Sequence, residues 1–344
     1  MNEVTNIFMI DSKIDKYKAN ENYLFTFYQK LGSGSYGVVY DIGDGCVVKI
    51  FFHSILGKTH FEERPSVIPY KNENRELAFY FRLMKEDIKK HIENHLLPPL
   101  GIGYLTEEMK LDKHVFEKYS YFVILPLCIP FHKIFKIRNH PLLHHKDGKR
   151  FVFEFMFKML KANQYLEKEY QMIHLDIKLT NIMYLYDDSF KLLSKDDLIT
   201  PNSKENVKTA LSFQFHEKMI LLDYSLIKRK YNPSGTEVPF ILDEFDKKNG
   251  DFQYYIWPNE NENFMIKHIP TYSLGISVIE ILLGKEKAIR SSKMEDRITM
   301  IEEVYNQYDD IGYLLKKALV EKINIDEMFK IVKELYQKIY SISK

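Results

Sequence analysis

The sequence predicts an α+β protein of two lobes, and three observations carry this prediction. Over about the first third of the chain, short apolar runs alternate with turns that contain Gly and Asp. After Pro130 the apolar residues recur instead at helical spacing. The 344 residues are enough to build two hydrophobic cores. Because strands and helices segregate along the chain, we expect a strand-rich lobe, a helical lobe and a cleft between them.

The composition is typical of a globular protein, and the balance of charges does not favour a nucleic-acid partner. Hydrophobic residues make up 45% of the chain, and 49 Lys and Arg against 48 Asp and Glu leave a formal net charge of +1. Disordered chains carry fewer apolar residues, and nucleic-acid-binding proteins concentrate positive charge, so both classes are disfavoured. Cys46 and Cys128 lie in apolar runs and are expected to be buried thiols in a reducing compartment.

The sequence also predicts a soluble cytoplasmic protein. Its first residues carry charges where a signal peptide has an apolar core. Its most apolar stretch, residues 121–131, contains two prolines and is too short to span a bilayer. We therefore expect no membrane span and no nucleic-acid partner.

The apolar runs of the first lobe have the composition of strands. LFTFYQKL, GVVYDI, CVVKIFF and YFVILPL are rich in β-branched and aromatic residues. The GDG sequence at 43–45 predicts a hairpin turn. One amphipathic helix, ENRELAFYFRLMKEDIKKHI, interrupts the strands. Residues 1–22 are polar and are expected to be an N-terminal extension, which places the first lobe at 23–127.

The second lobe, residues 128–344, is expected to consist mainly of helices. The run TYSLGISVIEILLG, at 271–284, is apolar nearly all round and should be buried. Residues 187–212 are polar and separate two strand-like runs, IMYLY and KMILLDYS. We interpret them as a surface insertion at the tip of a hairpin, where added chain length costs little free energy.

The stretch LGSGSYGVVY places Gly32, Gly34 and Gly37 at the spacing G-x-G-x-x-G. Glycines lack a Cβ atom, so the backbone can approach a phosphate closely. The spacing also fits a dinucleotide-binding turn or a plain Gly/Ser hairpin. A dinucleotide-binding turn leads into a helix, whereas this loop leads into a strand-like run, which disfavours that interpretation. A glycine-rich hairpin over the phosphates of ATP fits the context.

Lys49 lies within the apolar strand CVVKIFF, soon after the glycine-rich stretch. A buried lysine is costly without a partner, and a phosphate group is a suitable partner. The alternative is a lysine at a strand edge whose ammonium group reaches water.

The sequence HLDIKLTN, residues 174–181, favours the phosphate partner. It brings four polar groups together at the spacing H-x-D-x-K-x-x-N. Asp176 can accept a proton from a hydroxyl group, Lys178 can neutralise a γ-phosphate, and Asn181 can hold a metal ion. Asp223, at the end of the apolar run in KMILLDYS, lies where a second metal ligand is needed.

With these elements in this order, the chain resembles the protein kinase superfamily over about residues 23–340. The resemblance implies a bilobal protein-kinase-like fold and ATP-dependent phosphoryl transfer, with Mg²⁺ as the cofactor and Mn²⁺ as an alternative. A lysine two residues after Asp176 is similar to the serine/threonine kinase pattern, which implies protein substrates. Two alternatives stay open: a pseudokinase that serves as a scaffold, and a kinase of small molecules or lipids.

The resemblance also implies roles for single residues. Asp176 would be the catalytic base, and Asn181 and Asp223 would hold the metal ion. Glu76, with Glu73 as the alternative, would pair with Lys49. The nucleotide would contact Gly32, Ser33, Gly34, Ser35, Gly37, Val39, Val47, Lys49, Leu125, Leu127 and Met183. Of these, Val39 and Val47 would cover the adenine, Met183 would lie beneath it, and the hinge at 125–129 would present backbone groups to its edge.

The chain departs from the family at several positions. Leu175 replaces the usual arginine, and Asp223-Tyr224-Ser225 replaces Asp-Phe-Gly. Pro270 stands where an aspartate usually begins the helix that supports the catalytic loop. The acid of the A-P-E motif is assigned to Glu260 in preference to Glu244. Such divergence is similar to that of kinases from large DNA viruses or intracellular parasites, for which the host cytoplasm would be the location.

Regulation should follow from Leu175. A leucine cannot pair with a phosphate on the activation segment, so we expect the protein to be active without phosphorylation of that segment. Control would act through an activating partner, or through the Lys49–Glu76 pair and the packing of Tyr80 and Tyr224 beneath it. The alternative is that another basic residue, Lys228 or Arg229, receives a phosphate.

Two histidine-containing stretches are further candidates for a metal site. His91 and His95 in HIENH have the i, i+4 spacing of a zinc pair, but they have no evident third ligand, so a solvated helix face is expected. Residues 140–150, HPLLHHKDGKR, are expected to form an exposed loop.

Overall fold

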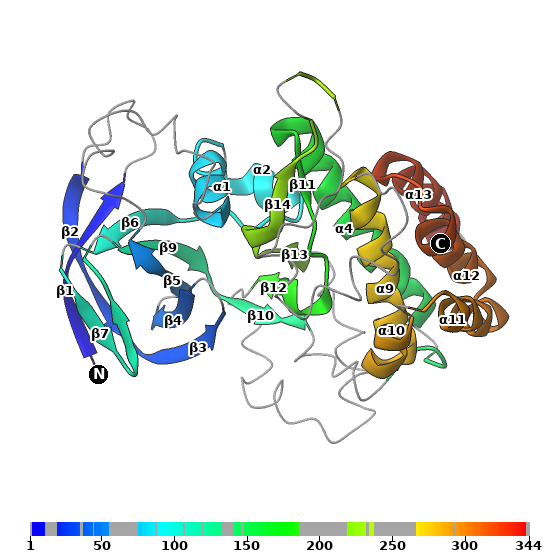
Figure 1. Cartoon of the computed structure of the whole chain (residues 1–344), viewed down its shortest axis with the longest axis horizontal. Helices are drawn as coiled ribbons and strands as arrows, with labels where there is room; N and C mark the ends of the chain where they lie inside the picture. The colour runs from blue at the N-terminus through cyan, green and yellow to red at the C-terminus, as the bar shows by residue number, and fades with distance from the viewer. Residues whose placement is uncertain are drawn as a thin grey trace. The chain divides into compact units, whose positions relative to one another are not determined.

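A computed structural model of the chain describes residues 2–10, 19–34, 37–43, 45–54, 75–86, 88–105, 107–118, 120–131, 141–145, 148–185, 219–231, 234–236, 266–291 and 293–341. The chain divides into two compact units. Unit 1 comprises Met1–Cys128 and Leu185–Phe190, and unit 2 comprises Ile129–Tyr184 and Lys191–Lys344. Unit 1 is built around a sheet and unit 2 is mainly helical, so the predicted α+β class is confirmed (Figure 1).

Unit 1 contains a seven-stranded antiparallel sheet in the order β2-β1-β6-β9-β5-β4-β3 (Figure 1). Its strands are β1 (Asn2–Ile10), β2 (Ala19–Phe27), β3 (Gln29–Ser33), β4 (Gly37–Gly43), β5 (Cys46–Ser54), β6 (Gly101–Leu105) and β9 (Ser120–Pro126). Gly43 and Gly45 have φ values of 86° and 71° between β4 and β5. Glycine adopts this left-handed region without strain, which explains why the hairpin turns at the predicted position.

The sheet begins inside the segment 1–22 that the sequence predicts to be an extension. β1 pairs with β2 on one side and with β6 on the other, so these residues add two strands to the sheet. The run NEVTNIFMI mixes polar and apolar residues without the strict alternation of a half-buried strand. Because of this irregular pattern, the composition alone indicates an extension rather than a strand.

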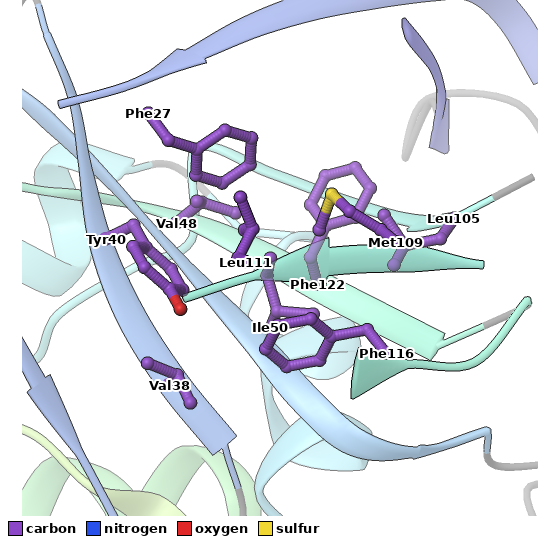
Figure 2. Packing of buried hydrophobic residues seen from close by; sticks show 10 residues of the cluster. All are labelled: Phe27, Val38, Tyr40, Val48, Ile50, Leu105, Met109, Leu111, Phe116 and Phe122. Atoms are coloured by element: carbon purple, nitrogen blue, oxygen red, sulfur yellow. The ribbon is translucent and has the colours of Figure 1, made fainter. Parts of the chain in front are cut away.

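The two faces of the sheet differ in chemistry. Alternation along β4 and β5 sends one set of side chains into a hydrophobic core (Figure 2). The hairpin of β7 (Met109–Leu111) and β8 (His114–Phe116) covers this core. The core residues are Phe27, Val38, Tyr40, Val48, Ile50, Leu105, Met109, Leu111, Phe116 and Phe122.

The opposite face of the sheet carries the side chains expected to contact a nucleotide. Val39 pairs with Lys49 across β4 and β5, and Val47 pairs with Leu125 across β5 and β9. Residues directly opposite in antiparallel strands share a face, and so do alternate residues of one strand. The four side chains therefore lie on one face, away from the aromatic core.

Two short helices, α1 (Arg75–Leu83) and α2 (Ile88–Glu93), complete the described part of unit 1. The expectation that HIENH forms a solvated helix face is wrong, because both His91 and His95 are buried. His91 Nε2 lies 2.9 Å from the carbonyl oxygen of Leu83, at the end of α1. Helix ends leave carbonyl groups without intrahelical partners, so His91 is a structural cap. The described residues contain no cluster of three His, Cys, Asp or Glu that could hold a metal ion.

Unit 2 is organised around the helices α4 (Gly148–Tyr170) and α9 (Ile269–Leu283). Every residue of α9 is buried, as its apolar composition predicts. α9 contacts α4, α10 (Lys285–Arg290), α12 (Asp309–Lys316) and α13 (Ile325–Ser341), while α11 (Met294–Gln307) packs on α12. Among the described helices, Ile266–Leu283 is the one long and apolar enough to cross a membrane, but 83% of it is buried inside the protein, as expected of a core helix. Shorter segments are the 3₁₀ turn Ile266–His268 and the π-helix Lys317–Glu321.

The described part of the 140–150 stretch is not simply an exposed loop. Leu142 and Leu143 are buried, and their N–H groups donate to the carbonyl oxygens of Ile281 and Leu282 at 3.0 and 3.1 Å. These are among the last carbonyl groups of α9, so the segment caps the C-terminus of the core helix.

Short strands in unit 2 carry the polar motifs. β10 (Cys128–Pro130), β12 (Ile182–Leu185) and β13 (Met219–Leu221) form one sheet. β11 (Met172–His174) pairs with β14 (Ile227–Arg229). The strand-like runs on either side of the predicted insertion pair as a hairpin, with Ile182 opposite Leu221. The insertion itself, 187–212, lies outside the described residues.

Candidate functional site

The glycine motif extends from the end of β3, through the connecting loop, to the start of β4. The N–H of Gly34 donates to the carbonyl oxygen of Gly37 at 3.0 Å, which closes the loop. A Cβ atom on Gly37 would lie 2.3 Å from the carbonyl oxygen of Ile50, so only glycine fits beside β5. A Cβ atom on Gly32 or Gly34 would meet no protein atom within 4 Å, as far as the chain is described. Internal packing therefore does not require these two glycines, and the backbone there is open to close approach by a ligand.

Lys49 of β5 and Glu76 of α1 form an ion pair within unit 1. Lys49 Nζ lies 2.5 Å from Glu76 Oε2, and the side chains are 15% and 1% exposed. Lys49 points away from the aromatic core, and Glu76 lies in the first turn of α1. The pair therefore keeps the ammonium group at the face that also carries Val39, Val47 and Leu125.

The residues predicted to contact the nucleotide differ in exposure where the structure describes them. Ser33 is exposed at the end of β3, Val39 is half-buried and Met183 is half-buried on β12. Ser35, Glu73, Glu244 and Glu260 lie outside the described residues. The N–H of Leu127 already donates to the carbonyl oxygen of Gly45 at 2.7 Å, so this amide is not a spare donor for an adenine edge. Cys46 and Cys128 are half-buried rather than fully buried.

Residues 174–181, the HLDIKLTN loop, alternate between buried apolar and polar side chains. Leu175, Ile177 and Leu179 are almost completely buried. Between these apolar residues, Asp176 and Lys178 bring their charged ends together. Lys178 Nζ lies 2.9 Å from Asp176 Oδ2. Leucine at 175 therefore serves the packing of the loop.

Asp176 carries one carboxylate oxygen with two partners and one with none. Asn181 Nδ2 donates to Asp176 Oδ2 at 2.8 Å and to the Asp176 carbonyl oxygen at 3.0 Å. Asp176 Oδ1 is buried and makes no hydrogen bond in the described structure. An unsatisfied buried acceptor costs free energy, and a hydroxyl donor would relieve that cost.

His174 holds the start of the loop as a neutral imidazole. Its Nδ1 accepts the N–H of Asp176 at 3.2 Å, so the proton is assigned to Nε2, which lies 3.2 Å from the carbonyl oxygen of Leu222. Burial lowers the pKa of His174 below 6.5 and outweighs the opposing effect of the carboxylates of Asp176 and Asp223. A second proton would also remove the Nδ1 acceptor.

Mild acid should therefore destabilise the protein through His174. In the unfolded chain this histidine takes up a proton near pH 6.5, whereas the buried ring resists it. Its contribution is complete above pH 6.5 and is lost as the pH falls toward the lowered pKa of the folded state. Urea unfolding at pH 7.5 and 5.5 should show a larger loss of unfolding free energy for the wild type than for His174→Gln. Equal losses in both proteins would contradict this assignment.

Asp223 follows β13 in an unusual backbone conformation. Its φ of 64° and ψ of 75° lie in the left-handed region, which Asp tolerates better than most residues. Its Oδ1 accepts the N–H of Ser225 at 3.3 Å and caps the 3₁₀ turn Tyr224–Leu226. The N–H of Leu222 donates to the carbonyl oxygen of Asn181 at 3.0 Å, in the 3₁₀ turn Leu179–Asn181. The two predicted metal ligands therefore belong to directly bonded segments.

Tyr224 fills the apolar position that the resemblance assigns to phenylalanine. It is completely buried, its ring packs edge-on to His174 with centroids 5.9 Å apart, and its hydroxyl donates to the carbonyl oxygen of Leu221 at 3.1 Å. The extra hydroxyl is thus satisfied, as a buried tyrosine requires.

Two residues that support the segments of the site are not indicated by the sequence. Ser277 of α9 places its Oγ 3.2 Å from the carbonyl oxygen of Ile177, within the HLDIKLTN loop. Lys230, just after β14, forms an ion pair with Glu167 of α4, and its N–H donates to the carbonyl oxygen of Gln171 at 3.0 Å. The one sequence signal for Ser277 is a hydroxyl in an otherwise apolar helix, and it does not name a partner.

No family model matches the chain, and no curated protein matches it. Among solved structures, the ROP18 kinase domain in complex with AMP-PNP and sucrose is similar, with a TM-score of 0.53 and 14% sequence identity. The match covers 98% of this chain and 87% of that chain. At this level of identity the likeness establishes the fold, and the predicted protein-kinase-like fold is confirmed.

Proposed function

We propose that the protein transfers the γ-phosphoryl group of ATP to serine or threonine hydroxyls of protein substrates. The observation that carries this proposal is Asp176, a buried carboxylate (3% exposed) with Lys178 and Asn181 on one oxygen and, among the described residues, no partner on the other. On a kinase-like fold, that arrangement fits a base that receives the proton of an attacking hydroxyl.

The other groups fit positioning and charge stabilisation. Lys178 compensates the negative charge of the Asp176 carboxylate. Lys49, held by Glu76, offers its ammonium group to phosphate oxygens, and the open backbone at Gly32 and Gly34 suits the approach of phosphates. Little covalent chemistry is required of the protein in phosphoryl transfer, so fixed charges and positions supply most of the rate enhancement.

The donor set fits Mg²⁺, with Mn²⁺ as the alternative. Asn181 donates its amide N–H groups to Asp176, so its amide oxygen is the atom left to act as a ligand. Asp223 supplies a carboxylate, and hard divalent cations prefer such oxygen ligands. When bound, the ion would neutralise charge on the phosphate oxygens.

Two other functions share this fold. A pseudokinase scaffold would be favoured by loss of Lys49, Asp176 or Asp223, and all three are present. A kinase of small molecules or lipids remains the second alternative, and Lys178 at the second position after Asp176 favours protein substrates over it by resemblance.

The acceptor class can be tested with radiolabelled ATP and Mg²⁺. Purified protein should label generic protein substrates such as casein or histone, because Lys178 is placed as in serine/threonine kinases. A panel of amino alcohols and lipids in the same assay should remain unlabelled. Labelling confined to the small molecules would overturn the protein-substrate assignment, and ATP binding without any labelling would support the scaffold.

A further inference from the structure

The backbone of the HLDIKLTN loop is held almost entirely by local hydrogen bonds. The N–H of Leu175 donates to the carbonyl oxygen of Leu226 at 3.4 Å, and that of Asp176 donates to His174. The carbonyl oxygens of Asp176 and Lys178 both accept from Asn181. Each of these partners lies within the loop or directly before β14, the strand that pairs with β11 at the start of the loop.

The carbonyl group of Ile177 has a different partner. Its oxygen lies 3.2 Å from the Oγ of Ser277, a residue 100 positions later and completely buried in the core helix α9. Ile177 stands between Asp176 and Lys178, so its peptide group connects the two polar side chains. The hydroxyl of Ser277 therefore contacts the backbone between the two residues that carry these side chains.

Ser277 is oriented by its own helix. Its Oγ also lies 2.9 Å from the carbonyl oxygen of Ser273, the bond that helical serines commonly make one turn back. One hydroxyl proton is therefore shared between Ser273 and Ile177. Pro270, near the start of the helix, has no side-chain donor, and Thr271 bonds the carbonyl oxygens of Ile323 and His268 instead.

We propose that Ser277 is a positioning residue that ties the HLDIKLTN loop to the core helix α9 through the carbonyl group of Ile177. The tie fixes the orientation of Asp176 and Lys178, and its effect on rate rests on the proposed function. Displacement of a reacting group by a fraction of an ångström is enough to slow a reaction, so loss of the hydroxyl should act mainly on kcat.

Three variants separate positioning from general stability. Ser277→Ala removes the hydroxyl, and Ser277→Thr restores it. Thr271→Val is the matched control, because it deletes a buried hydroxyl from the same helix whose bonds go to Ile323 and His268. The primary readout is amide hydrogen exchange in peptides covering 174–181, which requires no activity.

Ser277→Ala should raise exchange in the 174–181 peptides by about threefold or more, and Ser277→Thr should restore protection. Thr271→Val should leave these peptides unchanged even if it lowers the melting temperature. If the wild type transfers phosphate, kcat of Ser277→Ala should fall by about tenfold, with the KM for ATP within about twofold.

Wild-type exchange in Ser277→Ala would show that the hydroxyl serves only Ser273, and the proposal would fail. It would fail equally if Thr271→Val loosened the loop as much as Ser277→Ala. A wild type that transfers no phosphate would refute the proposed function, while the exchange data would still decide the role of Ser277.

Discussion

Asp176→Asn is expected to lower kcat for phosphoryl transfer by about 10²- to 10⁴-fold. The substitution keeps the shape of the side chain but removes the basic carboxylate, so the attacking hydroxyl loses its proton acceptor. It also removes the charge that Lys178 Nζ contacts at 2.9 Å. ATP affinity should change by less than about threefold, because Asp176 acts on the acceptor hydroxyl. Steady-state kinetics and a separate nucleotide-binding titration measure the two effects.

Asp296→Asn is a suitable control for the loss of one carboxylate. Asp296 pairs with Arg290 at 3.1 Å on the surface of unit 2, where ion pairs contribute little stability. Its kcat should equal that of the wild type. An Asp176→Asn protein that retained more than about a tenth of the wild-type kcat would exclude Asp176 as the base.

Lys49→Met should destabilise the fold by about 3 kcal/mol or more, in addition to abolishing transfer. The reason is Glu76, whose side chain is 1% exposed and would lose the cation that lies 2.5 Å away. Removal of one partner of a buried ion pair leaves a charge in a poorly solvated position. Urea unfolding of the single variant measures the loss.

The double variant Lys49→Met/Glu76→Gln separates stability from function. With the carboxylate neutralised, most of the lost unfolding free energy should return, because the two residues interact directly. Phosphoryl transfer should remain absent, since no ammonium group is available for the phosphates. Equal stability of the single and double variants would show that the stranded Glu76 carboxylate is not the cause of the destabilisation, and restored transfer in the double variant would refute the role of Lys49.

The parts of the site that local pattern specifies were predictable from the sequence. The glycine spacing, the position of Lys49 in an apolar strand and the alternation in HLDIKLTN each place side chains through the geometry of a single segment. A glutamate near the start of the helix could be proposed as the partner of Lys49 by resemblance, and the register of β4, β5 and β9 then explains why the pair lies opposite the aromatic core.

The parts that depend on partners distant in the sequence were not predictable. β1 joins the sheet through pairing with β2 and with β6, which its mixed composition does not reveal. The sequence around His91 is that of a surface helix, and it does not show that the carbonyl group of Leu83 lies beside the imidazole. The N–H of Leu127 donates to the carbonyl oxygen of Gly45, a partner that the sequence does not indicate. The hydroxyl of Ser277 contacts the carbonyl oxygen of Ile177 because of the packing of α9 within unit 2.

The most direct test of the proposed activity is identification of the labelled amino acid in a protein substrate after incubation with radiolabelled ATP and Mg²⁺. The wild type should produce phosphoserine or phosphothreonine over many turnovers per enzyme molecule, and Asp176→Asn should produce almost none. Two results would contradict the assignment of this chain as a serine/threonine kinase. One is a wild-type protein that labels the substrate no more than Asp176→Asn does, and the other is label found only on tyrosine.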